Sequence, residues 1–126
     1  MKPALAEKLA ALCGLLAVGL GAFGAHGLSR TLAQFQTAEI WDKAVFYHGI
    51  HAVVLFILAG RAPFRFGPWL CFLFGILLFS GSLYLLAATN ARWLGAVTPI
   101  GGTSFLIGWF WLMLRPVDDK ARKAQP

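Results

Sequence analysis

The sequence predicts an all-α membrane protein whose four transmembrane helices form an up-down-up-down antiparallel bundle. Three observations lead to this fold class: the number of long apolar runs, their similar length, and the short segments between them. An α-helix rises about 1.5 Å per residue, so about 20 apolar residues cross the roughly 30 Å hydrocarbon core of a bilayer. Short connections favour antiparallel neighbours. The four predicted helices cover residues 9–28, 44–59, 68–89 and 96–114.

Composition supports the same class. Hydrophobic residues make up 59% of the 126 residues and charged residues 13%, and the mean hydropathy is +0.71. A soluble domain carries about 25% charged residues, so this chain lacks the polar surface that water requires. Neither a repeat nor a change of composition divides it. We therefore expect one four-helix transmembrane domain over residues 1–126, with a short basic cytoplasmic tail at residues 116–126.

The first predicted helix, residues 9–28, is rich in glycine. Small side chains let membrane helices approach closely, and Ala17, Gly21 and Ala25 repeat every four residues. This stripe predicts that the other helices pack around the first one.

The connection after the first helix, residues 29–42, contains neither glycine nor proline. Leu28, Leu32 and Phe35 fall on one helical face, which predicts a short interfacial helix. Trp41 is expected at headgroup depth, where amphipathic aromatic rings gather. Such a helix can continue directly into the second crossing.

The remaining connections are shorter. Pro63 and Pro68 interrupt helix between the second and third crossings, because proline lacks a backbone N–H and clashes with the preceding turn. Residues 90–95 form the next turn. The fourth helix opens at Thr98-Pro99, where proline is tolerated because a first-turn N–H has no partner within the helix.

Basic residues are distributed unequally between the two predicted sides of the membrane. Eight share the side of the two termini: Lys2, Lys8, Arg61, Arg65, Arg115, Lys120, Arg122 and Lys123. Three fall on the other side: Arg30, Lys43 and Arg92. By the positive-inside rule, both termini face the cytoplasm. Membrane lipid with acidic headgroups is the expected partner of the basic side. Nucleic acid is not expected, because no basic stripe is interleaved with exposed aromatic residues on a soluble surface.

Polar residues are costly within hydrocarbon and often functional, so their positions are informative. The predicted topology gathers them toward the outer leaflet, where helix ends and connections meet. This possible polar cluster consists of His26, Glu39, Asp42, His48, His51, Tyr84, Asn90 and Thr98.

His48 and His51 are three positions apart, so their rings project from nearly one helical face. Two imidazoles at this spacing can share a metal ion, with His26 or Glu39 as a further ligand. A proton relay or a substrate-binding role is a second interpretation. We favour a third, interhelical hydrogen bonding, in which Tyr47 and the histidines reach serines, threonines or backbone carbonyls. Since an H-x-x-H pair arises often by chance, no metal and no cofactor are expected.

Catalysis is not expected either. Ser80 and Ser82 lie mid-membrane without a histidine at a comparable depth on their helix, and the apolar runs hold no pair of carboxylates. A nucleophilic serine needs a base within hydrogen-bond reach. The sequence therefore predicts that the protein is not an enzyme.

Four segments, taken in order, resemble the signatures of one small membrane family. They are residues 21–27 (GAFGAHG), Tyr47-His48 with His51-Ala52, residues 79–84 (FSGSLY) and residues 98–102 (TPIGG). The family is known as domain of unknown function 423; it includes bacterial YgdD-like and YwdK-like proteins, and transmembrane protein 256 of eukaryotes is similar. The resemblance runs from about residue 9 to residue 114. It implies a four-helix plan and the bacterial plasma (inner) membrane, and it supplies no catalytic residues because members have no assigned activity.

The favoured function is that of a structural or accessory component of the inner membrane, without enzymatic activity. One alternative is a small transporter or channel-like protein, a homo-oligomer in which the polar cluster lines an opening between protomers. Another is a metal-, haem- or quinone-binding protein that uses His26, His48 and His51. Another membrane protein is also a possible partner.

Overall fold

A computed structural model of the chain describes residues 1–115, 123, 124 and 126. All regular elements in these residues are helical. In order they are α1 (Pro3–Ala25), α2 (Ser29–Phe35), α3 (Ala38–Ala59), α4 (Phe66–Gly75), the π-helical turn η1 (Ile76–Ser80), α5 (Gly81–Thr89), the 3₁₀ helix η2 (Arg92–Ala96) and α6 (Thr98–Leu114).

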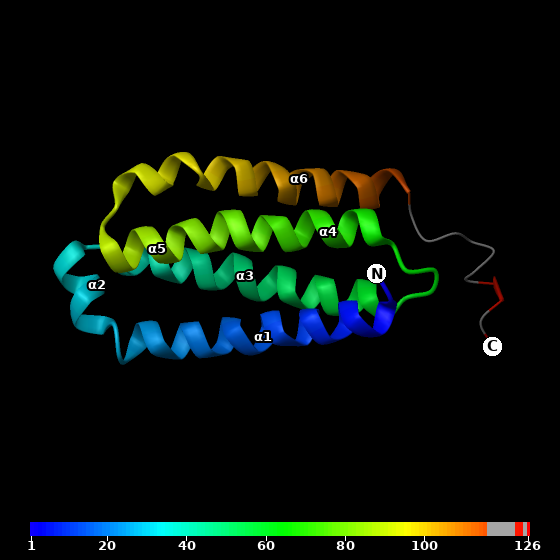
Figure 1. The fold of residues 1–126 in the computed structure, drawn as a ribbon, viewed down its shortest axis with the longest axis horizontal. Coiled ribbons are helices and arrows are strands. Elements are labelled where there is room, and N and C mark those ends of the chain that lie inside the picture. The colour runs from blue at the N-terminus through cyan, green and yellow to red at the C-terminus, as the bar shows by residue number, and fades with distance from the viewer. Residues whose placement is uncertain (116–122, 125) are drawn as a thin grey trace.

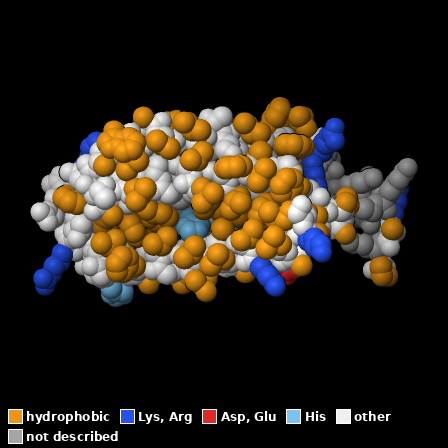
Figure 2. Space-filling view, viewed as in Figure 1, with side chains coloured by type: hydrophobic (Ala, Val, Ile, Leu, Met, Phe, Trp, Pro, Cys, Tyr) orange, Lys and Arg blue, Asp and Glu red, His pale blue; other side chains and the backbone are white. Residues whose placement is uncertain are grey.

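Four stretches of helix in the described part of the chain are long and apolar enough to cross a membrane: Pro3–Ala25, Ala38–Ala59, Phe66–Thr89 and Arg92–Leu114. The predicted all-α fold with four membrane-length helices is confirmed. Figure 2 shows hydrophobic side chains over the middle of one face, with lysine and arginine side chains toward both ends. Such a surface suits a hydrocarbon layer between two charged interfaces.

The four spans lie side by side, and their connections lie at alternate ends of the molecule (Figure 1). The central helix is α3, which packs against α1 on one side and against α4, η1 and α5 on the other. The last helix, α6, packs on α4 and η1, so α1 and α6 form the two edges. The prediction that the other helices gather around the glycine-rich first helix is therefore wrong.

The first helix begins at Pro3, not at residue 9 as predicted, and ends at Ala25, not at residue 28. Proline in the first turn starts it, and Glu7 and Lys8 extend it while remaining exposed. A charged residue does not end a helix at headgroup depth, where water and phosphate groups solvate it. The apolar run thus marks the hydrocarbon part of this helix rather than the whole of it.

The connection between the first two spans contains the expected short helix, α2. It ends at Phe35 and is followed by Gln36, whose φ of 55° is in the left-handed region. The following helix α3 begins at Ala38, six residues before the predicted start at residue 44. His48 and His51 therefore lie near the middle of a 22-residue helix rather than near its outer end. Ten residues correspond to about 15 Å, so His48 is about half a hydrocarbon core from the helix start.

The third span begins at Phe66, two residues before the predicted start, and contains the π-helical turn η1. The fourth span has its α-helical part over Thr98–Leu114, two residues later than predicted. The predicted basic tail lies mostly outside the described residues, which omit 116–122 and 125.

The contact between the last two spans is built from glycines that face phenylalanines. Gly75 of α4 lies against the Phe105 ring, and Gly108 of α6 lies against the Phe72 ring. Because glycine has no Cβ, the facing ring occupies the space that a side chain would fill. This close approach brings the α6 residues near the centre of the fold.

Candidate functional site: hydrogen bonds around α3

Side chains of α3 and of residues beside it connect this helix to its neighbours by hydrogen bonds. The Trp41 indole N–H donates to the backbone carbonyl of Leu20 in α1, at 2.9 Å. Near the start of α3, the buried Thr37 hydroxyl donates to the carbonyl of Ala87 in α5, at 2.7 Å. Trp41 is 3% exposed and lies between helices in the first turn of α3. Its headgroup depth stays a prediction.

The π-helical turn supplies a further connection. Ser80, at the end of η1, is fully buried and donates to the Ala44 carbonyl of α3, at 2.8 Å. A π-turn leaves the regular backbone hydrogen-bond pattern and re-aims the side chains near it. Ser80 thereby contributes to packing between the second and third spans, and its hydroxyl has a partner in a region without water.

His48 forms the first of two histidine contacts inside the bundle. Its Nδ1 atom lies 2.8 Å from the Tyr84 hydroxyl of α5, and the two rings meet edge to face. The Tyr84 ring also meets Trp41 edge to face, with centroids 4.8 Å apart. His48, Tyr84 and Trp41 therefore form one continuous aromatic and polar contact between the second and third spans.

His51 forms the second contact, and its hydrogen bonds define its protonation. The Trp109 indole nitrogen of α6 lies 3.0 Å from Nε2 of His51, and an indole nitrogen can only donate. Nε2 is therefore the acceptor without a proton. The proton is on Nδ1, which donates to the Tyr47 carbonyl at 2.7 Å. His51 is thus neutral, and both ring nitrogens have a partner.

Aromatic rings surround His51. Its ring stacks on Phe105 of α6, with centroids 3.8 Å apart and planes 13° from parallel. Phe72 of α4 lies 5.5 Å away, centroid to centroid. His51 therefore joins α3 to α4 and α6 through ring packing as well as through the Trp109 hydrogen bond, and its 4% exposure reflects this packing.

Two more hydrogen bonds connect α6 to the third span. The Ser104 hydroxyl donates to the Cys71 carbonyl of α4 at 2.7 Å, and the hydroxyls of Thr98 and Ser82 lie 2.7 Å apart. Among the described residues, the Trp69 indole N–H is the buried side-chain polar group without a partner. Nearly every buried polar side chain in this part of the chain is therefore used in packing, as interiors without water require.

The structure divides the predicted polar cluster into two groups. His48, His51, Tyr84 and Thr98 lie in the bundle and make the contacts described above. His26, Glu39, Asp42 and Asn90 are exposed at one end of the spans, and Asn90 accepts a hydrogen bond from Arg92 at 2.9 Å. The three histidines therefore do not form one cluster. Within the described residues, no group of three or more His, Cys, Asp or Glu side chains is close enough to hold a metal ion.

The prediction of interhelical hydrogen bonds by the two helical histidines is confirmed, with partners that differ in part from those expected. The interhelical partners are Tyr84 of α5 and Trp109 of α6, not the serines, threonines or backbone carbonyls expected. The Tyr47 carbonyl that accepts from His51 belongs to α3 itself. Trp109 is not identified as a partner of His51 by the sequence analysis. A tryptophan inside an apolar run, five residues before the run ends, was the available signal.

The comparisons with known proteins agree with this architecture. The family model described as "Protein of unknown function (DUF423)" matches residues 20–102. The chain belongs to the DUF423 family. The matched residues include the His48–Tyr84 and Ser80–Ala44 contacts and end seven residues before Trp109.

Curated relatives carry the description of a membrane protein. The chain is 45% identical to a UPF0382 membrane protein of Staphylococcus haemolyticus over 111 residues, which cover 84% of this chain and 89% of that protein. It is 44% identical to the UPF0382 membrane protein YwdK of Bacillus subtilis over 116 residues, which cover 86% and 93%. No solved structure matches the chain. The chain is therefore an integral membrane protein of a family whose biochemical role is unknown.

Proposed function

We propose that this DUF423 protein is a structural or accessory component of the bacterial cytoplasmic membrane, without catalytic activity. The supporting observation is the use of its interior polar groups. Hydrogen bonds connect α3 to α1 through Trp41, to the third span through Ser80 and Tyr84, and to α6 through Trp109. These side chains hold the helices together, and the two ring nitrogens of His51 are both engaged.

The proposed function includes an orientation: an up-down-up-down bundle with both termini in the cytoplasm. Its support is the distribution of charge over the ends of the spans. The end that carries the amino terminus also carries the described basic residues Lys2, Lys8, Arg61, Arg65 and Arg115. The opposite end carries Arg30, Lys43 and Arg92. The positive-inside rule places the more basic end in the cytoplasm.

A metal- or haem-binding role has less support from the geometry. Ligation through Nε2 of His51 would break the Trp109 hydrogen bond, and ligation through Nδ1 would break the bond to the Tyr47 carbonyl. The nearest histidine in sequence, His48, points its Nδ1 at Tyr84. Structural hydrogen bonding thus accounts for three of the four ring nitrogens.

A double-mutant cycle at His48 and Tyr84 tests the structural role. We expect His48→Phe and Tyr84→Phe to lower the free energy of unfolding in detergent, with a coupling energy of about 0.6 kcal/mol, typical of hydrogen bonds between membrane helices. Metal analysis of tag-free protein accompanies it. One bound metal per chain, lost in His48→Ala, together with zero coupling to Tyr84, would contradict the proposal.

Cysteine labelling tests the orientation separately. In a background with Cys13→Ala and Cys71→Ala, Arg92→Cys should react with a membrane-impermeant maleimide in intact spheroplasts. Arg61→Cys should react only after permeabilisation. Labelling of both positions from the same compartment would reject the up-down-up-down arrangement of the spans. Labelling of Arg61→Cys alone from outside would show that the termini face away from the cytoplasm.

A further inference from the structure

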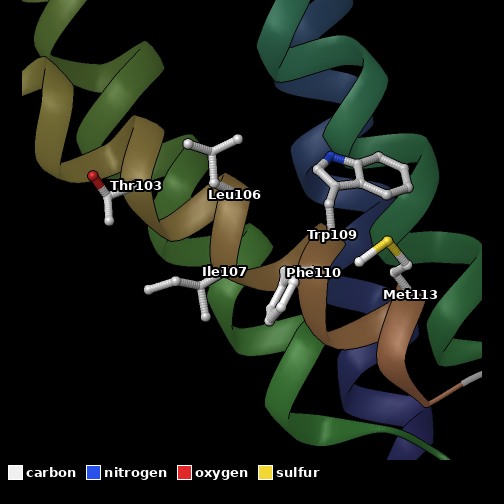
Figure 3. Close-up of a pocket in the computed structure, with 6 residues that line it drawn as sticks. All are labelled: Thr103, Leu106, Ile107, Trp109, Phe110 and Met113. Atoms are coloured by element: carbon white, nitrogen blue, oxygen red, sulfur yellow. The ribbon is translucent and has the colours of Figure 1, made fainter.

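One face of α6 carries an open apolar groove. It has a volume of about 530 Å³, within the range of about 300–1,000 Å³ common for ligand sites. Figure 3 shows its side chains projecting from a single helix, with the Trp109 indole turned toward α3. The lining consists of Thr103, Leu106, Ile107, Trp109, Phe110 and Met113.

The shape of the groove fits a chain-like ligand. From Thr103 to Met113 the helix rises about 15 Å, which is about half of the hydrocarbon core and therefore the depth of one leaflet. The Thr103 hydroxyl already donates to the Pro99 carbonyl at 2.8 Å, so the lining presents almost no free polar group. A lipid acyl chain has this length and this chemistry.

Arginines gather where the groove ends. Arg115 follows the last turn of α6, two residues beyond Met113, and is exposed. Arg65, which precedes α4, donates through its guanidinium to the Arg115 backbone carbonyl, so its charge lies beside the end of α6. Arg61, in the same connection, is exposed. Guanidinium groups at headgroup depth are suited to bind a phosphodiester, which they can bond in a bidentate manner.

We propose that this groove binds an anionic glycerophospholipid of the cytoplasmic leaflet, with an acyl chain along α6 and the phosphate at Arg65 and Arg115. The proposal rests on the proposed orientation, which places this end in the cytoplasmic leaflet. Charge complementarity selects this occupant, because apolar residues alone would accept any acyl chain. The Trp109 hydrogen bond to His51 fixes one wall of the groove and so joins the lipid site to the interior of the bundle.

Native mass spectrometry of the full chain tests the proposal. The protein is released from nanodiscs of phosphatidylglycerol or of phosphatidylethanolamine, and bound lipid is counted. We expect one phosphatidylglycerol to be retained and phosphatidylethanolamine to be retained at least about tenfold less. The reason is that each arginine near an anionic group raises the affinity several-fold.

Variants separate the headgroup from the groove. Arg65→Gln with Arg115→Gln should lower phosphatidylglycerol retention about tenfold. Ile107→Trp should lower it by filling the groove. The matched controls are Arg92→Gln, at the opposite end, and Val18→Trp, on the exposed face of α1; both should retain lipid as the original chain does.

Three results would overturn the proposal: equal retention of the two lipids, retention that survives both the arginine and the Ile107 variants, or a dimer that covers the groove in place of lipid. Thermal unfolding of each variant in detergent verifies that it is folded. Lipid retention does not depend on which side of the membrane the termini face. A loss of retention can therefore be distinguished from a reversed orientation, which the labelling experiment would detect.

Discussion

The two edge helices, α1 and α6, look alike in sequence but pack differently. Both are rich in glycine. In the most apolar part of each span, 17% of the residues are buried. In α6, Gly101 lies against the backbone of Phe79 and Gly108 against the Phe72 ring. In α1, a Cβ added at Gly14 or Gly19 would meet no atom of another described helix within 4 Å. Glycine permits close approach, but a facing group must use the space.

The contact surface of α1 is made mainly of alanine. Ala6, Ala10 and Ala17 are buried, and of the glycines Gly24 comes closest to the partner helix, against the Trp41 indole. The predicted stripe of Ala17, Gly21 and Ala25 is therefore correct at its first two positions, since a Cβ at Gly21 would lie 3.3 Å from Val45, whereas Ala25 is exposed. The alanine surface of α1 packs against one neighbouring helix. The glycine positions of α6 leave space that residues of its neighbouring helix fill.

The largest predicted effect is at the closest contact of α6. Gly101→Ala should lower the free energy of unfolding in detergent by about 3 kcal/mol, because the new methyl group meets the Phe79 backbone, which cannot rotate away. The adjacent Gly102 provides the control: its Cβ would lie 3.6 Å from the Phe79 ring, an ordinary contact. Equal losses in Gly101→Ala and Gly102→Ala would show that the interlocked contact does not exist.

A smaller effect is predicted where the obstacle is a ring. Gly75→Ala should cost about 2 kcal/mol, since its methyl group meets Phe105, and Phe105→Leu in the same chain should recover part of this loss. The measurement is a double-mutant cycle in detergent, with an expected coupling above about 0.5 kcal/mol. If the losses of unfolding free energy in the two single variants simply add in the double variant, Gly75 and Phe105 are not in contact.

The tryptophans that connect the edges to α3 allow a direct comparison. Trp41→Phe should cost about 1.5 kcal/mol, because it removes an indole that is 3% exposed along with its bond to the Leu20 carbonyl. Trp109→Phe should cost only about 0.6 kcal/mol, since Trp109 is 45% exposed. Chemical unfolding followed by circular dichroism measures both. Trp93→Phe, at 71% exposure, should leave the midpoint unchanged; the reverse order for Trp41 and Trp109 would contradict the comparison.

The smallest effect is predicted at the open glycines of α1. Gly14→Ala and Gly19→Ala should raise the free energy of unfolding by about 0.5 kcal/mol each, because alanine has the higher helix propensity and the space beside both positions is open. Unfolding in detergent measures the change. A loss as large as that of Gly101→Ala would reveal a second protein packed on this face of α1.

Particular residues show how far sequence reasoning reached. Asn90 was assigned to a turn, and its φ of 58° ends α5, as asparagine tolerates the left-handed region. Gln36 adopts a similar φ without any such signal, because glutamine seldom occurs there, so the boundary between α2 and α3 was not predicted. The same boundary determines how far His48 and His51 lie from the start of α3, so the sequence predicts them too near the end of that helix.

The sequence by itself determined that the protein has four membrane-length helices and belongs to the DUF423 family. The helices can be predicted because hydrocarbon requires every backbone N–H and carbonyl to bond within the protein, and long apolar helices meet this requirement. Only the tertiary structure decided that α3 is central, that His51 bonds to Trp109, and that Gly14 and Gly19 of α1 face open space while Gly101 and Gly108 of α6 face close neighbours. The reason is that lipid-facing and protein-facing surfaces are both apolar here, so periodicity does not reveal which face of a helix meets its neighbour.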